Sequence, residues 1–254
     1  MTSIVIVGAG PRGAGVLERI AANAPELASD EGVDVHLVDP YPHGAGRIWR
    51  YEQSALLWMN SMAADVTMFT DDSVRIDGPI APGPTLWDWA EAVRDGRLDD
   101  VTVADDVLDE LRALTPATFP TRRLQSFYLA WVLHHVEATL PPGVRVHHHA
   151  TRAVGLVEGR DGHPERVRLG TGEELDADAV VLASGHLDAT PPADEQKLIA
   201  FADEHGLRYF PPEQTTDSAL DDIPPGETVI ARGMGLAFVD LVVLLFEEIG
   251  RAHV

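Results

Sequence analysis

Three glycines near the start of the chain have the spacing of a phosphate-binding turn. Gly8, Gly10 and Gly13 follow an apolar run at 4–7 and precede an amphipathic stretch. In a strand–turn–helix unit the first glycine permits the tight turn, the second lets a phosphate approach the backbone, and the third lets the helix pack closely on the sheet. Free N–H groups and the helix dipole at such a turn favour negative charge. The predicted pyrophosphate site comprises Gly8, Gly10, Pro11, Arg12 and Gly13.

Asp39 ends a second apolar run at 33–38, where a carboxylate can accept hydrogen bonds from a ribose hydroxyl. It would also repel a 2′-phosphate, which argues against NADP at this first site. Arg12 either reaches a phosphate or caps the solvent side of the turn. Strand, glycines, helix, strand and terminal acid together favour a dinucleotide site over a glycine turn of an unrelated α/β protein. On these residues alone, NAD and FAD both remain open.

The elements that must position this turn alternate between strands and helices. We expect an α/β protein with a Rossmann-like fold, a mostly parallel sheet, a β-meander and a helical insertion. The helix at 16–22 is expected to end before Pro25, and 40–84 reads as a long loop with short helices. The remaining predicted elements are helices at 85–95, 104–113 and 121–139, strand at 144–157, a hairpin leading to 166–169, and a buried strand at 179–183.

The predicted domain organisation has three parts. Residues 1–190 form the dinucleotide-binding domain, with the helical and loop insertion at about 42–140, and 191–225, rich in proline and acidic residues, form a linker. Residues 226–254 begin a second, incomplete NAD(P)-binding unit, with a strand at 228–231. The apolar helix 236–249 would then need a cover, from a homodimer partner or a missing C-terminal region.

Composition excludes several classes of function. The chain has 41 acidic and 19 basic residues and a net charge of −22, which argues against nucleic acid or an anionic membrane as partner. Without cysteine there is no disulfide, thiolate metal site or redox-active dithiol. The N-terminus lacks the features of a signal peptide, and the most apolar stretch is far shorter than the ~20 residues that span a bilayer. We therefore expect a cytoplasmic protein.

His147, His148 and His149 invite a metal interpretation, but alternate residues of a strand point to opposite faces. We expect two exposed imidazoles around one half-buried imidazole, and no metal site. The sequence has no nucleophile elbow and no P-loop lysine, so hydrolysis and phosphoryl transfer are unsupported. In flavin chemistry the cofactor performs the difficult step. We therefore assign no catalytic residue.

Several segments resemble parts of flavoprotein monooxygenases and favour FAD. The segment 43–49 resembles the G-G-x-W loop that runs along the flavin, and 178–186 looks like the "ATG" strand of two-dinucleotide flavoproteins. The strand at 144–150 and the hairpin after it match the meander of that superfamily. The segment 229–240 looks like the second glycine turn, with Phe238 in place of the third glycine. The resemblance implies cofactor contacts for Gly46, Trp49, Asn60, the backbone of Ala150, Ser184, Gly185, Gly233 and Gly235.

Two of these residues have structural alternatives, since Trp49 could be a core residue and Asn60 a buried structural asparagine. The resemblance covers nearly the whole chain, which is similar to a family of bacterial FAD/NAD(P)-binding proteins. It rests on Gly-Ala-Gly-Pro-Arg-Gly at 8–13 and on the segments 58–71 and 232–240. Members of that family are usually much longer than this chain, and some relatives are flavin-dependent N-hydroxylating monooxygenases acting on amino acids.

The resemblance implies an FAD-dependent oxidoreductase of monooxygenase type that uses NADPH or NADH, and it does not name the substrate. The alternative is a non-catalytic dinucleotide-binding or sensing protein, or a truncated flavoprotein fragment that binds FAD only.

Overall fold

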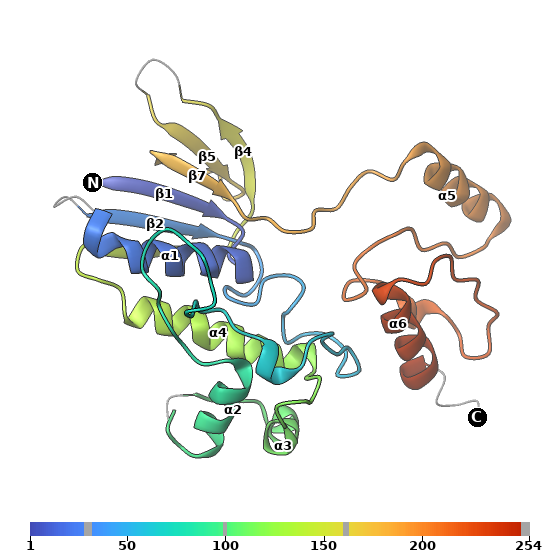
Figure 1. Ribbon diagram of the computed structural model, residues 1–254. Coiled ribbons are helices and arrows are strands. Elements are labelled where there is room, and N and C mark those ends of the chain that lie inside the picture. The colour runs from blue at the N-terminus through green and yellow to red at the C-terminus, as the bar shows by residue number, and fades with distance from the viewer. Residues whose placement is uncertain (28–31, 99–100, 160–162, 250–254) are drawn as a thin grey trace. The chain divides into compact units, whose positions relative to one another are not determined.

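Figure 1 shows the computed structural model, which describes residues 1–27, 32–98, 101–159 and 163–249. The chain divides into two compact units. Unit 1 comprises Met1–Glu52 and Trp58–Gly185, and unit 2 comprises Gln53–Leu57 and the chain from His186 onward. Each unit is described by itself.

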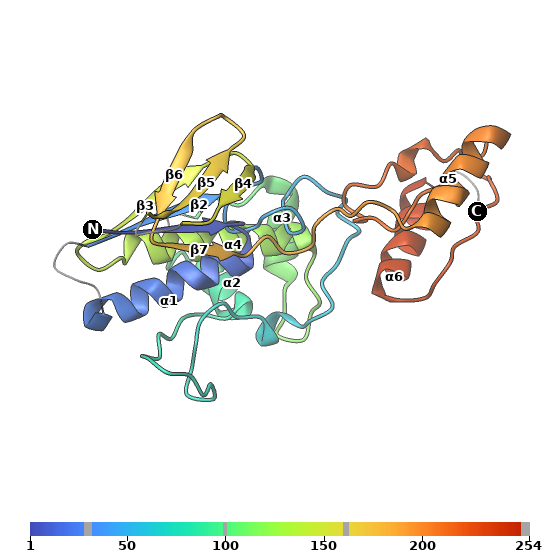
Figure 2. The same cartoon turned by 90° about the horizontal axis from the view of Figure 1, so that it is seen from above.

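The centre of unit 1 is a four-stranded parallel sheet, which confirms the mostly parallel sheet that the sequence predicted. Its strands, in spatial order, are β3 (Val144–His149), β2 (Val33–Val38), β1 (Thr2–Val7) and β7 (Ala179–Leu182), and Figure 2 shows them side by side. Side chains alternate across β1, with Ile6 packed in the cluster under the helices and Val5 in the cluster under the meander. Both faces of the sheet are therefore covered, as parallel sheets require.

Two long helices cover the first face: α1 (Pro11–Leu27) and α4 (Arg122–Ala138) (Figure 1). The insertion also contains the short η1 (Ala63–Asp65), α2 (Leu86–Arg94) and α3 (Asp105–Ala113). Thr85 and Asp88 form a capping box that fixes the start of α2, and Thr121 caps α4 by accepting the Leu124 N–H. These caps explain why the predicted starts of α2 and α4 agree with the structure within one residue.

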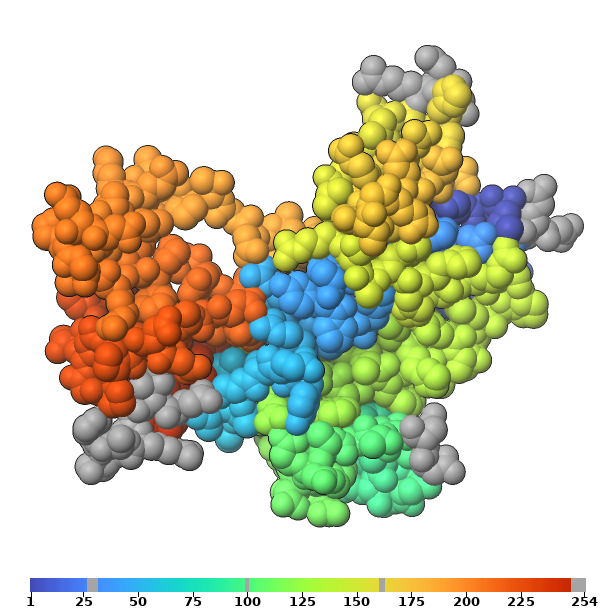
Figure 3. All heavy atoms as spheres, turned by 180° about the vertical axis from the view of Figure 1, so that it is seen from behind, coloured from blue at the N-terminus to red at the C-terminus, as the bar shows by residue number. Residues whose placement is uncertain are grey.

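The second face carries an antiparallel meander of β4 (Ala153–Val157), β5 (Glu165–Leu169) and β6 (Glu174–Ala177), which projects from unit 1 in yellow in Figure 3. Val167 and Leu169 of β5 and Leu175 of β6 pack against Val5 and Val38 of the parallel sheet. The predicted hairpin is confirmed. The sequence interpretation missed β6, because Glu174–Ala177 has only two apolar residues in four.

Unit 2 contains α5 (Ala193–His205), η2 (Leu220–Asp222), α6 (Leu236–Val243) and the π-helical turn η3 (Leu244–Ile249). The segment expected as a linker thus includes a helix, and no strand forms at 228–231 among the described residues. Apolar side chains of α6 and η3 such as Leu236, Val239 and Phe246 are 57–70% exposed. Their covering partner stays a prediction.

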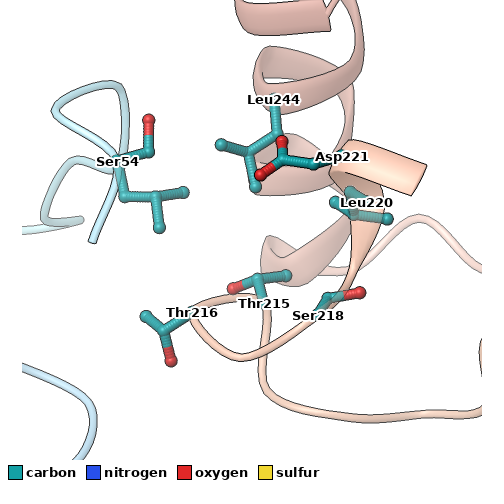
Figure 4. A pocket seen from close by; sticks show the side chains of 8 residues that line it. Ser54, Thr215, Thr216, Ser218, Leu220, Asp221 and Leu244 are labelled. Carbon is teal, nitrogen blue, oxygen red and sulfur yellow. The ribbon is translucent and has the colours of Figure 1, made fainter. Parts of the chain in front are cut away.

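A small core in unit 2 joins Leu57, Leu220, Ile223 and Leu244. Next to it lies a pocket of about 140 Å³, and Figure 4 shows the side chains of Ser54, Thr215 and Ser218 around it. The described part of the chain has no helix long and apolar enough to cross a membrane.

Several sequence expectations were wrong in detail. The helix predicted at 16–22 starts earlier, at Pro11, and the strand predicted at 144–157 is divided into β3 and β4. Helix α1 continues through Pro25 to Leu27, so this proline does not end the helix as the sequence predicted. The strand at 179–183 was expected to be buried, but Leu182 is 67% exposed. The reason is its position, since β7 is the edge of the sheet in the described residues.

Tyr128 connects α4 to the loop before α2. It is fully buried, its hydroxyl donates to the Pro84 carbonyl (2.7 Å) and accepts from the Met68 N–H (3.3 Å), and burial raises its pKa to about 12. Tyr128→Phe leaves both backbone groups without this partner, so we expect a loss of about 1–3 kcal/mol in the free energy of unfolding. Urea denaturation measures it. Tyr51→Phe is the matched control, because the Tyr51 hydroxyl bonds Asp106 at the surface; an equal loss there would contradict the argument.

Candidate dinucleotide-binding site

The first glycine turn lies where β1 ends between its two neighbouring strands. Gly8 has φ +101°, its N–H donates to the Val38 carbonyl (2.8 Å), and a Cβ there would lie 2.5 Å from the Ala183 oxygen. A Cβ on Gly13 would overlap the carbonyl oxygen of Gly8. The two glycines therefore allow α1 to start directly against the sheet, which is the role predicted for them.

The turn presents unused donors at the start of α1. Among the described residues, the amides of Gly10, Arg12 and Gly13 donate no hydrogen bond, and Pro11 at the first helical position has no N–H. The Arg12 side chain is exposed and makes no ion pair with the described residues. Such a helix start, with a cation beside it, suits a diphosphate.

Asp39 has a role that the sequence did not reveal. Its side chain is buried, with Oδ2 accepting the Ala9 N–H (2.8 Å) and Oδ1 accepting the Tyr41 N–H (2.9 Å). A carboxylate has about four acceptor positions, so these two bonds leave capacity for a ribose hydroxyl. The bond from Tyr41 to Asp39 spans only two residues, so the sequence could have indicated it. The bond from Ala9 spans 30 residues and left no local signal.

A second glycine loop packs directly on the first. The Gly44 N–H donates to the Ala9 carbonyl (2.7 Å), and a Cβ on Gly46 would lie 2.9 Å from the Gly10 Cα. Both Gly44 and Gly46 have positive φ, at +88° and +63°. The structure thus brings Gly46 to the predicted pyrophosphate turn, in backbone contact with it.

Other predicted residues converge on the same edge of the sheet. A Cβ on Gly8 would lie 2.9 Å from the Ser184 Cα, and Gly185 follows with φ +70°. The Asp39 N–H donates to the His149 carbonyl (3.1 Å). Ala150, which directly follows His149, is therefore at the same edge as Asp39. In open α/β sheets ligands bind outside the carboxyl ends of the strands, which is where these residues lie.

The residues predicted near a flavin ring have different environments. Trp49 is partly buried and packs against the main core of unit 1, in agreement with the alternative prediction that it is a core residue. Asn60 is exposed, and the alternative of a buried structural asparagine was wrong. The reason is that Met59, between two exposed residues, supplies the buried side chain of this segment.

The second predicted glycine turn differs from the first. Gly233 has φ +104° and Gly235 caps α6, but a Cβ on either would meet nothing within 4 Å. Gly233 and Gly235 therefore lack the close backbone approach that makes Gly8 and Gly13 irreplaceable. They lie in unit 2, and the structure tests neither as a cofactor contact.

Histidines gather along β2 and β3. His147 and His148 are exposed and His149 is half-buried, so the expected order was wrong. The His36 and His147 rings stack at 4.7 Å, and His36 Nδ1 lies 3.0 Å from His149 Nε2. Within residues 1–27, 32–98, 101–159 and 163–249, no group of three or more metal-ligating side chains is placed to hold an ion.

The His36–His149 contact predicts acid sensitivity. Burial is the main cause that lowers the pKa of both groups in the folded protein, helped for His36 by His147. The unfolded chain then binds protons more readily, so the free energy of unfolding falls as pH drops below about 6.5. Urea unfolding between about pH 7.5 and pH 5 should show this slope, and His36→Gln should reduce it. An unchanged slope in His36→Gln would exclude the contact as its source.

Comparison with known proteins agrees with this geometry. The profile of a family described as FAD-NAD(P)-binding matches residues 5–187. The chain is 45% identical over 250 residues to an L-aspartate N-monooxygenase (nitrosuccinate-forming) of Streptomyces davaonensis, covering 96% of this chain and 38% of the relative. It is 42% identical to the nitrosuccinic acid synthase npaA of Aspergillus oryzae, covering 95% of this chain and 35% of that protein.

The chain thus spans little more than a third of the length of these curated relatives. Among solved structures, a lysine monooxygenase of Nocardia farcinica matches 82% of this chain and 49% of its own, with 15% identity and a TM-score of 0.43.

Proposed function

Because the chain belongs to the FAD-NAD(P)-binding family, we propose that it is the FAD-binding part of a flavin-dependent N-monooxygenase that oxidises the amine of an acidic amino acid. The observation that carries the proposal is the 45% identity over 96% of the chain to an L-aspartate N-monooxygenase. The reductant of such an enzyme is NADPH or NADH, and its place is the cytoplasm, where both are abundant.

The residues at the carboxyl edge of the sheet fit FAD. The three unused amides of Gly10, Arg12 and Gly13 suit its pyrophosphate, and Asp39 has acceptor capacity for its ribose. By the same proposal, the Ala150 backbone faces the adenine, Ser184 and Gly185 border the cofactor, and the isoalloxazine lies near Gly46, Trp49 and Asn60.

When bound, FAD supplies the two-electron chemistry and the activation of oxygen. In one round, an amine, O₂, NAD(P)H and a proton give a hydroxylamine, NAD(P)⁺ and water. One oxygen atom forms the N–O bond, the other leaves as water, and two electrons come from NAD(P)H. The residues of this chain bind and orient the cofactor in this scheme.

Absorption spectroscopy of the purified 254-residue chain with FAD tests the proposal. We expect a flavin spectrum, with quenched flavin fluorescence, that survives gel filtration. Bleaching by NADPH or NADH, with faster reoxidation in the presence of L-aspartate than of L-lysine, would support the N-monooxygenase.

The other outcomes discriminate between the alternatives. Flavin binding without bleaching would favour a chain that binds FAD only, and reduction without any amino-acid effect would overturn the substrate class. A chain that is colourless after incubation with excess FAD and removal of the unbound FAD by gel filtration would overturn the cofactor assignment.

A further inference from the structure

Gln125 on α4 is a buried side chain whose hydrogen-bonding capacity the protein does not use. The residue is 4% exposed, and its Oε1 is buried with no hydrogen-bond partner among the described residues. A carboxamide oxygen can accept two hydrogen bonds, and leaving a buried polar atom without any partner costs free energy. Folded proteins contain few such atoms, so this one requires an explanation.

The neighbouring residue Ser126 shows the ordinary arrangement of a buried polar side chain. Ser126 is also buried, but its Oγ donates to the Arg123 carbonyl oxygen (2.9 Å) within the same helix. At position 125, leucine or methionine would have a similar helix propensity and no polar atom to satisfy. Packing and helix formation alone therefore do not explain why residue 125 is a glutamine.

The segment 58–60 reaches the start of α4 close to Gln125. Trp58 forms an isolated antiparallel β-bridge with Thr121, which is the N-cap of α4. Gln125 lies one helical turn further along, and its backbone N–H donates to the Thr121 carbonyl (3.1 Å). Asn60, which was predicted to lie near a flavin ring, belongs to the same segment as Trp58.

The second glycine loop reaches α4 on the other side of Gln125 along the helix. A Cβ on Gly44 would lie 2.6 Å from the Leu129 carbonyl oxygen, and Leu129 follows Gln125 by four residues, on the same face of α4. The chain after Gly44 then runs back towards the start of the helix, because the rings of Tyr51 and Phe127 are in contact at 5.5 Å. Gln125 thus lies on α4 between the contacts of this loop and those of Trp58.

We infer that Gln125 is a cofactor-binding residue whose Oε1 accepts a hydrogen bond from an N–H group of the isoalloxazine. The two segments that meet α4 on either side of it contain Gly46, Trp49 and Asn60, which the proposed function places near this ring. The ring carries N–H donors and carbonyl acceptors, and a carboxamide can complement both. The buried oxygen is then satisfied when the cofactor binds. The identity of the cofactor rests on the proposed function.

Urea denaturation of the chain without FAD tests the unused oxygen. Gln125→Met removes the atom without a partner and keeps an unbranched side chain, so we expect the equilibrium constant of unfolding to fall by about fivefold or more. Gln196→Met is the matched control, because Gln196 is exposed and its Nε2 donates to the Pro191 carbonyl (2.7 Å). The same substitution there should give no stabilisation.

Isothermal titration calorimetry with FAD and with ADP tests the contact with the ring. ADP contains the adenosine diphosphate part of FAD and no isoalloxazine, so it reports on the glycine turn without the ring. We expect Gln125→Met to weaken FAD binding by about tenfold and to leave ADP binding within about twofold of wild type. The visible absorption bands of bound FAD should also shift, because the ring loses a hydrogen bond.

Ser126→Ala is the control for this measurement, since it changes a buried polar neighbour on the same helix and should keep the wild-type ratio of FAD to ADP affinity. Equal losses of FAD and ADP binding in Gln125→Met, or no loss of either, would overturn the contact with the ring. Destabilisation of the FAD-free chain by Gln125→Met would overturn the unused oxygen. A wild-type chain that binds ADP and not FAD would overturn the proposed cofactor and the ring contact with it, whereas the urea result does not depend on FAD.

Discussion

Replacing Gly13 with alanine is expected to cost about 3 kcal/mol or more in the free energy of unfolding and to abolish FAD binding. The added Cβ would overlap the Gly8 carbonyl oxygen and come within 3.4 Å of the Ile6 side chain. Both neighbours belong to the sheet and its turn, so the start of α1 must move away. The amides of Gly10 and Arg12 would move with it. Urea denaturation and FAD fluorescence titration measure the two losses.

Gly15 provides a control within the same helix. A Cβ there meets nothing within 4 Å, so Gly15→Ala should only gain helix propensity, a stabilisation of up to about 1 kcal/mol. FAD affinity should not change. If Gly13→Ala and Gly15→Ala behaved alike, close packing of α1 on the turn would not be the reason for the glycine.

Replacing Asp39 with alanine is expected to have the second largest effect. It removes the acceptor of both the Ala9 and the Tyr41 amides, and leaving buried donors without partners costs about 1–3 kcal/mol each. We expect the free energy of unfolding to fall by about 2–6 kcal/mol and FAD affinity by at least about a hundredfold. Asp39→Asn keeps one side-chain oxygen, so its losses should lie between wild type and alanine.

Asp34 is the matched control for Asp39 because it lies towards the other end of the same strand. Its carboxylate pairs with Arg145 (2.9 Å) and His147 (3.0 Å). Asp34 lies near the start of β2, whereas the glycine turn lies beside the end of β2. Asp34→Asn should leave FAD affinity unchanged. A loss equal to that of Asp39→Asn would mean that general acidity, and not the two amide bonds, explains the effect.

The parts of the fold that follow local rules were predictable. The apolar runs of β1 and β2, the glycine spacing of the turn and the helices α2 and α4 depend on patterns of a few residues, and each lies close to where it was expected. The parallel sheet followed from strands that alternate with helices. Gly46 and Ser184, predicted to contact the cofactor, lie next to the glycine turn that contains Gly8, because the carboxyl ends of parallel strands meet at one edge.

Features that depend on distant partners were not predictable. Nothing in the sequence around His43 indicates that it meets His148, since the contact depends on the register of β2 with β3. The amide bond of Ala9 to Asp39 has the same origin. The strand expected at 228–231 illustrates the converse, since an apolar run forms a strand only where another strand pairs with it.

The peptide groups on either side of Ala9 are both held by the protein itself, one through the Asp39 carboxylate and one through the Gly44 amide. The turn therefore has its final shape before any ligand arrives, and its ordering entropy belongs to the folding of the chain. Small anions such as pyrophosphate would then meet a preorganised receptor, with association limited by diffusion and no slow conformational phase.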